Sequence, residues 1–270
     1  MKRYNIKINS FSGYLHSRIY QFCKILMNSS IRILLLSLLF LFNGCLRTYY
    51  PTIYHTSSSP IIFYTKTNLE QGSNYLGMDL TAAKGSYDDE EIYLIKCSYL
   101  NVKTEDHINV SWEIFGNSGV YRVSGVGKEY DGTKTLFGLG GNIKFNLNFK
   151  IDNLKIGLGL SFGGASEFGE YYSFRKSGER NGVIDSNEDL ILPMFSLFPV
   201  FAYEFSESTV LSSQMNIGLP GIISPSVVLN NDGYVYWLSW IPDNDLKENY
   251  FGQRIVFGFL MDLSKFGITF

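Results

Sequence analysis

The sequence predicts an all-β protein, an antiparallel up-and-down transmembrane β-barrel of about 8 to 10 strands. Three observations support this prediction. Apolar and polar residues alternate along several long runs after Cys45. The connections between these runs are alternately short and long, as in outer-membrane barrels. The mean hydropathy is near zero, which excludes a bundle of membrane helices but fits strands whose two faces differ in polarity.

The clearest alternation lies in TLFGLGGNIKFNLNFK, residues 135–150. Successive side chains of a strand point to opposite faces, so one face of this run is apolar and the other carries Gly, Asn and Lys. The apolar face holds Phe137, Leu139, Ile143, Phe145, Leu147 and Phe149. Asp152-Asn153 is a tight-turn pair, and LKIGLGLSFG then repeats the pattern. Residues 135–164 therefore predict a long hairpin.

Strand length separates two interpretations of such a hairpin. In a soluble sandwich the apolar face packs on a second sheet, whereas in a membrane barrel it faces lipid. A membrane strand needs about 9 to 11 residues, while a soluble strand typically has about 5 or 6. The long runs favour the barrel, and a lipid-tethered soluble β-sandwich remains the alternative.

The same criteria locate the other strands. Strand-like runs occur at 74–84, 91–101, 107–115, 135–150, 154–164, 190–205, 209–219 and 250–270. Two further runs, at 223–229 and 234–241, form either two more strands or an extracellular hairpin above an eight-stranded barrel. The longer connections are 85–90, 116–134, 165–189 and 220–249. Long loops of such barrels face the outside of the cell, so both ends of the barrel domain are expected on the periplasmic side.

The N-terminal region resembles a bacterial lipoprotein signal. IRILLLSLLFLF, residues 31–42, is an apolar run too short to span a bilayer but typical of a signal peptide. Gly44 precedes Cys45, as a small residue precedes the cysteine that receives diacylglycerol in that family. The resemblance implies lipidation at Cys45. We therefore predict a leader over 1–44, with translation starting at Met27, a periplasmic tether over 45–72 and the barrel over 73–270.

The C-terminus resembles the insertion signal of bacterial outer-membrane β-barrel proteins. Phe266, Ile268 and the terminal Phe270 share one phase of alternation. In that family such residues engage the barrel insertion machinery, which is thus an expected partner together with outer-membrane lipid. The apolar phase changes between Asp262 and Lys265, so a bulge or turn is expected there.

No catalytic set is visible in the sequence. His107 lies beside Glu105 at a predicted periplasmic turn, and His55 lies in the predicted tether; both are interpreted as non-catalytic. Residues 185–189, DSNED, match only the first half of a calcium loop and are interpreted as a solvated acidic loop. The mixed charges of 165–189 indicate a solvated surface. The aromatic residues Tyr234, Tyr236, Trp237 and Trp240 indicate an interfacial belt.

These observations predict an integral protein of the bacterial outer membrane with a structural or surface-interaction role. We expect no enzymatic activity, no cofactor and no metal site, because no catalytic set or complete metal-binding motif is visible. We expect no nucleic-acid partner, since the net charge is −2. An extracellular partner would bind through loops 165–189 and 220–249. The alternatives are a narrow channel for small solutes or ions, and the soluble surface lipoprotein.

Overall fold

The computed structural model describes residues 46–63, 72–87, 89–105, 107–241, 244–246, 249–251 and 253–268. The predicted leader, the predicted lipidation site Cys45 and the terminal Phe270 lie outside these residues. Residues 47–270 form one compact unit by themselves. No helix of the described part is long and apolar enough to cross a membrane.

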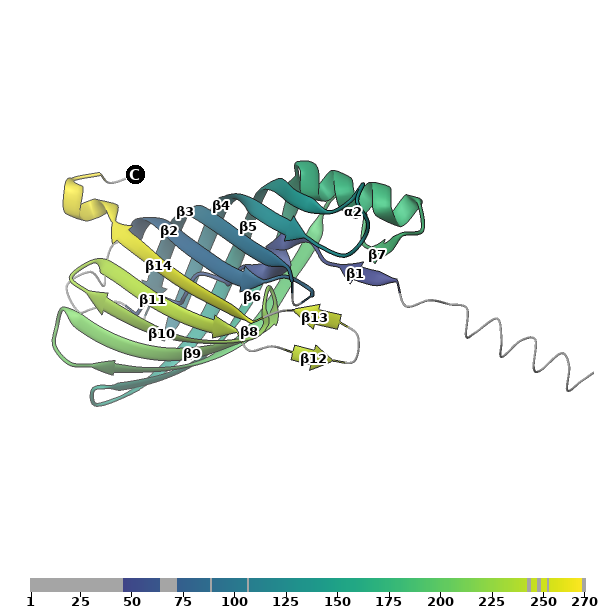
Figure 1. The fold of residues 1–270 in the computed structure, drawn as a ribbon. Coiled ribbons are helices and arrows are strands. Elements are labelled where there is room, and N and C mark those ends of the chain that lie inside the picture. The colour runs from purple at the N-terminus through teal and green to yellow at the C-terminus, as the bar shows by residue number, and fades with distance from the viewer. Residues whose placement is uncertain are drawn as a thin grey trace, which may run out of the picture. The chain divides into compact units, whose positions relative to one another are not determined.

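Ten strands close into one antiparallel barrel in chain order (Figure 1). They are β2 (Ser73–Lys84), β3 (Glu91–Glu105), β4 (Ile108–Val123), β5 (Gly132–Ile151), β6 (Leu154–Phe168), β8 (Leu192–Glu204), β9 (Thr209–Leu219), β10 (Ile222–Asn231), β11 (Tyr234–Ile241) and β14 (Arg254–Asp262). The last strand pairs with the first and closes the wall, from Arg254 opposite Ala83 to Asp262 opposite Tyr75. The predicted barrel is confirmed in its ten-stranded form, because β10 and β11 are part of the wall.

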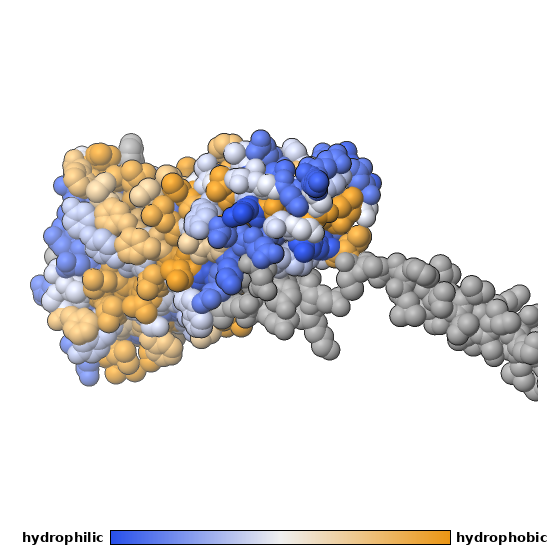
Figure 2. Space-filling view, in the orientation of Figure 1, coloured by the Kyte–Doolittle hydropathy of each residue, from blue (hydrophilic) through white to orange (hydrophobic). Residues whose placement is uncertain are grey.

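The two faces of the wall differ as the alternation predicts. Phe145 on β5 is 47% exposed and points outward, while its neighbour Lys144 is 1% exposed and points into the lumen. Outward residues on the other strands are mostly Leu, Ile, Phe and Tyr, and they appear as orange patches on the barrel surface (Figure 2). The inner face holds buried Asn, Ser, Lys, Asp and Glu.

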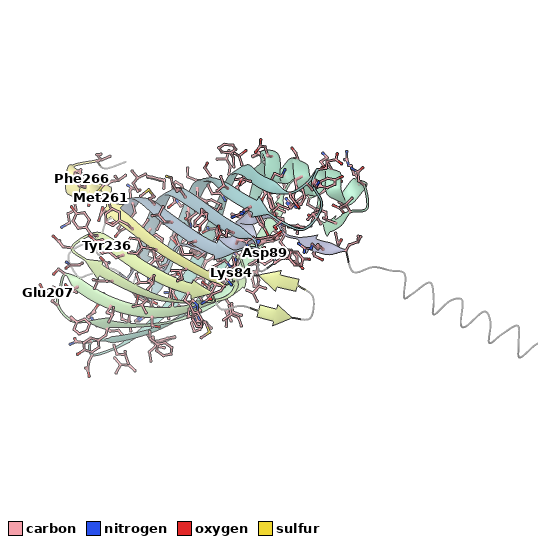
Figure 3. All side chains as sticks on the ribbon, in the orientation of Figure 1. Lys84, Asp89, Glu207, Tyr236, Met261 and Phe266 are labelled. Atoms are coloured by element: carbon pink, nitrogen blue, oxygen red, sulfur yellow. The ribbon has the colours of Figure 1, made fainter. Side chains whose placement is uncertain are left out.

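The two ends of the barrel also differ. One end, here called the short-turn end, carries the connections 106–107, 152–153, 205–208 and 232–233. Asp232 and Gly233 both have positive φ, as a tight two-residue hairpin turn requires. The other end, the long-loop end, carries 85–90, 124–131, 169–191 and 242–253, together with the tight turn 220–221. Glu207 and Phe266 mark the short-turn end, and Lys84 and Asp89 the long-loop end (Figure 3).

The long-loop end contains small elements outside the barrel wall. Helix α2 (Glu170–Arg180) and strand β7 (Ile184–Ser186) lie between β6 and β8, and β12 (Asn244–Leu246) pairs with β13 (Asn249–Phe251). The helix was not predicted. It buries Tyr171, Phe174, Arg175 and Gly178, which recur at the spacing of one helical face.

The segment before the first barrel strand differs from the expected tether. Residues 46–63, here called the plug segment, contain β1 (Arg47–Tyr49), the 3-10 turn η1 (Thr52–His55) and an extended run. From Pro51 to Phe63 nearly every residue is buried. A ten-stranded barrel has a wider interior than an eight-stranded one, which wall side chains just fill, and this segment occupies the interior. Residues 64–71 of the expected tether lie outside the described part.

The C-terminal strand is shorter than expected. Strand β14 ends at Asp262, and the 3-10 turn η3 (Leu263–Phe266) follows, with Asp262 accepting a hydrogen bond from the Ser264 amide at 2.9 Å. The predicted break between Asp262 and Lys265 is confirmed as this turn. Phe266 and Ile268 are therefore not in a barrel strand, and both are exposed. Their role as an insertion signal stays a prediction.

The closed barrel predicts membrane retention that does not depend on a lipid. A Cys45→Ser variant, exported by a non-lipid signal peptide, should stay in the outer-membrane fraction after carbonate washing. It should also migrate differently on a gel before and after boiling, because a closed barrel resists detergent until it is heated. A soluble periplasmic product with a single mobility would contradict the membrane barrel.

Candidate functional site

Four charged side chains lie in the middle of the lumen. Lys96 on β3 contacts Asp79 on β2 at 3.0 Å and Glu113 on β4 at 3.5 Å. Lys144 on β5 contacts the other oxygen of Glu113 at 3.2 Å. All four side chains are at most 3% exposed. The two positive and two negative groups balance, which buried charges require because their desolvation is costly.

The plug segment completes this charge cluster. The Lys96 ammonium donates to the Ser57 carbonyl at 3.2 Å and to the Ser59 hydroxyl at 3.1 Å. Ser59 in turn donates to Glu113 at 2.6 Å, and Lys144 donates to the Ser59 carbonyl at 2.6 Å. The serine-rich stretch that the sequence analysis assigned to a tether therefore supplies hydrogen-bond partners for buried charges.

Toward the long-loop end, ionic and polar contacts hold the segment. Glu167 on β6 accepts hydrogen bonds from the Thr52 amide and hydroxyl, both at 2.5 Å. Arg175 of α2 forms a salt bridge with the same carboxylate at 2.9 Å. Arg254 on β14 donates to the Tyr54 carbonyl at 2.6 Å. Glu167 and Arg175 are thus buried, which corrects the expectation that the charges of 165–189 form a solvated surface.

Toward the short-turn end, the segment packs on apolar wall residues. Ile61 and Phe63 form a cluster with Phe198, Val200, Ala202 and Val210. The wall also bonds to the backbone here: the Ile61 amide donates to Gln214 at 3.1 Å, and Asn230 donates to the Phe63 carbonyl at 2.9 Å. The plug segment is therefore bound along its length.

Little space remains around the charge cluster. Two cavities border Ser58, one beside Lys96 and one beside Lys144, and each has a volume of about 10 Å³. A single water molecule needs roughly this volume. In this conformation these parts of the lumen give hydrated ions no continuous path.

A second set of buried polar groups lies at the long-loop end. Tyr49 of β1 donates to Glu90 at 2.5 Å, and Tyr121 of β4 donates to the same carboxylate at 2.8 Å. Burial raises the pKa of Glu90, and the two hydroxyl donors and the Ser124 amide oppose that rise. Tyr171 of α2 stacks on Tyr121 with ring centroids 4.3 Å apart. These contacts attach β1 and α2 to the barrel rim.

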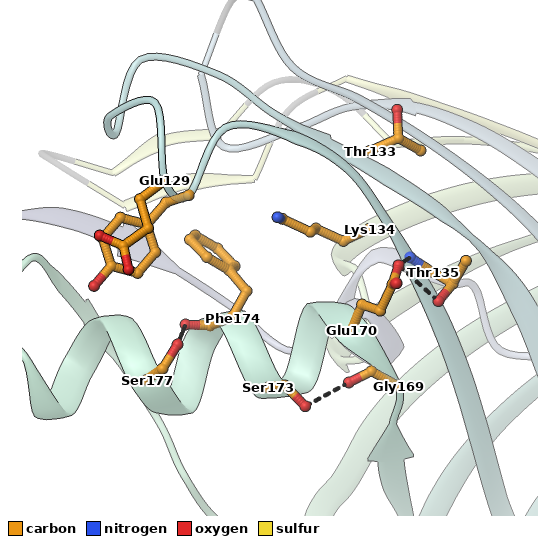
Figure 4. A pocket seen from close by; sticks show the side chains of 10 residues that line it. Glu129, Thr133, Lys134, Thr135, Gly169, Glu170, Ser173, Phe174 and Ser177 are labelled. Atoms are coloured by element: carbon orange, nitrogen blue, oxygen red, sulfur yellow. Dashed lines mark hydrogen bonds between the residues drawn. The ribbon is translucent and has the colours of Figure 1, made fainter.

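The same end carries an open groove of about 680 Å³ between α2 and the start of β5 (Figure 4). Its lining combines the charged side chains of Glu129, Lys134 and Glu170 with the rings of Tyr130 and Phe174. The remaining lining residues are Thr133, Thr135, Gly169, Ser173 and Ser177. Such a mixed surface suits recognition of a polar ligand or a protein loop.

The groove has no arrangement typical of a hydrolase. Ser173 donates to the Gly169 carbonyl at 3.1 Å, and Ser177 donates to the Phe174 carbonyl at 3.1 Å. Both hydroxyls thus bond to helix carbonyls rather than to a base that would activate them. Glu170 accepts hydrogen bonds from the Thr135 amide and hydroxyl at 2.9 and 3.0 Å, so its carboxylate joins α2 to β5.

The two histidines and the acidic loop that the sequence offered as candidate catalytic or calcium-binding groups lie apart from one another. The ring of His107 stacks near Phe149 at the short-turn end, and His55 is fully buried beside Tyr121. In the acidic loop, Asn187 accepts a hydrogen bond from the Asp189 amide at 2.6 Å. Within the described ranges, no three His, Cys, Asp or Glu side chains are placed to share a metal ion.

The residues predicted to form an aromatic belt do not all lie on the outer face. Tyr236 and Trp240 are exposed on the outer face, at 41% and 49%. Trp237, however, is buried in the lumen with Val228, Val235 and Leu260, because adjacent strand residues point to opposite faces.

The apolar residues on the outer face indicate that the barrel lies in a membrane. Exposed Leu, Ile, Phe, Tyr and Trp residues occur on all ten strands. Soluble monomers rarely expose contiguous apolar patches larger than a few hundred Å², whereas a membrane barrel requires an apolar band. The chain is a transmembrane β-barrel. Barrels of this antiparallel type, with short turns at one end and longer loops at the other, are found in the bacterial outer membrane.

No protein-family model and no curated protein sequence matches the chain. Among solved structures, an outer membrane channel from Pseudomonas putida F1 is similar at 8% identity and a TM-score of 0.41, over 76% of this chain and 100% of that one. Neisserial surface protein A is similar at 11% identity and 0.32, over 71% and 99%. The outer membrane protein OprG from Pseudomonas aeruginosa is similar at 9% identity and 0.31, over 71% and 93%.

The charge cluster predicts a large effect of one substitution. Glu113→Gln leaves two buried ammonium groups with one carboxylate, so the free energy of unfolding should fall by about 3–5 kcal/mol. Urea unfolding in detergent micelles measures this change. Glu129→Gln, at an exposed loop position, is the control and should change stability by less than about 0.5 kcal/mol. Adding Lys144→Met to Glu113→Gln restores the charge balance and should recover part of the lost unfolding free energy. Equal stability of Glu113→Gln and the parent would contradict the role of the charge cluster.

The raised pKa of Glu90 predicts a pH dependence with a definite sign. The pKa of the Glu90 carboxyl is higher in the folded than in the unfolded protein. Its contribution to stability is therefore complete at pH values below the unfolded pKa and is lost as pH rises through the folded pKa. The unfolding free energy of the parent relative to Glu90→Gln should therefore decrease from pH 4 upward. A difference that grows with pH would refute the assignment.

Proposed function

We propose that this protein is a lipid-anchored outer-membrane barrel without enzymatic activity that acts at the cell surface through its long-loop end. In the resting state its own N-terminal segment fills the lumen. The observation that carries the proposal is the binding of residues 52–63 along the lumen, from Thr52 at Glu167 to Phe63 at Asn230. A lumen occupied in this way does not serve free diffusion, so the function is assigned to the rim.

The rim supports a role in surface interaction. Helix α2 is fixed to the barrel through the Arg175–Glu167 salt bridge and through Glu170 bonded to Thr135. A groove beside a fixed helix is a pre-organised surface, which reduces the entropy cost of binding. We assign an extracellular partner to loop 165–189 and its groove. The other region expected to bind a partner, 220–249, consists mostly of the wall strands β10 and β11, so it is not assigned this role.

A narrow channel is the second candidate function, and the chemistry of the lumen favours it. The plug segment meets the wall largely through hydrogen bonds to Lys96, Lys144, Gln214 and Arg254. Water can replace such bonds, so displacement of the segment would leave a polar, hydratable lumen. We also propose that Phe266, Ile268 and Phe270 engage the barrel insertion machinery.

Conductance in planar bilayers separates the two candidates. The full chain should give no steady ion current, whereas a variant lacking residues 51–63 should conduct. Current through the deletion variant also shows that the barrel inserts into the bilayer. Both proteins must display the heat-dependent mobility of a folded barrel for this comparison. Steady currents from the full chain would support the channel instead. Absence of ion current from a folded deletion variant would show that the plug segment is not what closes the lumen.

A further inference from the structure

The plug segment has a definite direction through the barrel. At its start, Arg47 donates to the Ser124 carbonyl in the β4–β5 loop, and the Thr48 amide donates to Tyr87 at 2.8 Å. Strand β1 pairs in parallel with β7, beside α2 (Figure 1). At its end, Phe63 is bonded by Asn230, next to the 232–233 turn. The chain therefore enters the lumen at the long-loop end and leaves it at the short-turn end.

This direction places Arg47, the first residue of the compact unit, at the long-loop end. Two residues reach at most about 7 Å, while the hydrocarbon core of a bilayer is about 30 Å thick. A lipid attached two residues before Arg47 therefore cannot reach the leaflet at the short-turn end while Arg47 stays at the long-loop end. Long loops of outer-membrane barrels face the cell exterior.

We propose that the diacylglycerol on Cys45 inserts into the outer leaflet of the outer membrane, at the long-loop rim. The periplasmic leaflet, which an unthreaded tether would reach, is excluded by the path of the plug segment. This inference rests on the lipid anchor and the orientation of the proposed function. The anchor is then a surface lipid whose polypeptide passes through its own barrel.

A periplasmic anchor would require the plug segment to leave the lumen. That change would remove the Ser59 contacts of Lys96, Lys144 and Glu113, and would leave the buried charges without these partners. It would also expose Ile61 and Phe63, which are now 5% and 3% exposed. Both effects oppose withdrawal, so the lumen contacts keep the anchor at the long-loop end.

Cysteine labelling on whole cells tests the proposal. The background is Cys97→Ser with Cys45 retained, because Cys97 is exposed on β3. Single cysteines replace Leu46 beside the anchor, Lys128 in the β4–β5 loop and Glu207 in a short turn; all three positions are exposed. A membrane-impermeant maleimide is applied to intact cells and to permeabilised cells.

We expect Leu46→Cys and Lys128→Cys to react to a similar extent on intact cells, and Glu207→Cys to react at least tenfold less until permeabilisation. A Leu46→Cys variant that follows Glu207→Cys would overturn the proposal. If Glu207→Cys is the variant that reacts on intact cells, the orientation in the proposed function is wrong, and so is the outer-leaflet assignment. Leu46→Cys would still follow Lys128→Cys if the direction of threading is correct.

The lipid itself has a separate readout. In the Cys97→Ser background with no added cysteine, a lipidated Cys45 has no free thiol and cannot react with the maleimide. The mass of the N-terminal peptide should include the acyl groups. Labelling of Cys45 with an unmodified peptide mass would refute the anchor in the proposed function, and with it the outer-leaflet lipid.

Discussion

The structure depends on the pairing of four buried charges in the middle of the lumen. Lys96, Lys144, Asp79 and Glu113 come from four adjacent strands, and their charges sum to zero. Burial of an ion pair is favourable only when the remaining hydrogen-bonding capacity is also satisfied. The wall provides part of that capacity through Asn142, which donates to Glu113 at 2.9 Å. The plug segment provides more through Ser57 and Ser59, so filling the lumen also supplies hydrogen-bond partners for its buried charges.

The same requirement specifies the register of the wall. A shift of one residue between neighbouring strands would move every side chain to the opposite face. On β5 such a shift would place Lys144 in lipid and Phe145 against the charge cluster. Either placement costs several kcal/mol, since a charge facing the bilayer centre is costly and an apolar ring cannot bond to buried ions. The polar interior and the apolar exterior therefore select the same register.

The sequence was sufficient to predict the barrel wall but not the plug segment inside it. Period-two alternation is local, so residues 135–164 identify a hairpin and its two faces without knowledge of other strands. The plug segment depends on partners far away in the chain: Ser59 bonds to Glu113, Ile61 to Gln214 and Phe63 to Asn230. A Ser-rich stretch before Pro60 has the local composition of a linker. No local pattern shows that it is buried.

Helix α2 was missed for a different reason, because its signal is local but weak. Tyr171, Phe174, Arg175 and Gly178 have helical spacing, yet the helix includes a glycine and one member of its buried face is an arginine. Arg175 is buried beside Glu167, which neutralises it at 2.9 Å, and it also donates to the Ser186 hydroxyl and the Asn187 carbonyl. Glu167 lies on a barrel strand, so the face of this helix becomes recognisable only when the barrel is known.

The covalent attachment of the plug segment explains how modest contacts keep the lumen filled. A neutral hydrogen bond contributes only about 0.5–1.5 kcal/mol, and one to a charged group about 1.5–3 kcal/mol. A free peptide would lose much of this gain to the entropy cost of binding. Here β1 holds the segment at one end and the chain continues into β2 at the other, so its effective concentration at the lumen is of millimolar order or higher. At the rim, the Glu167 carboxylate accepts hydrogen bonds from Thr52 and also pairs with Arg175 of α2. The helix that borders the groove and the segment that fills the lumen therefore share one buried carboxylate.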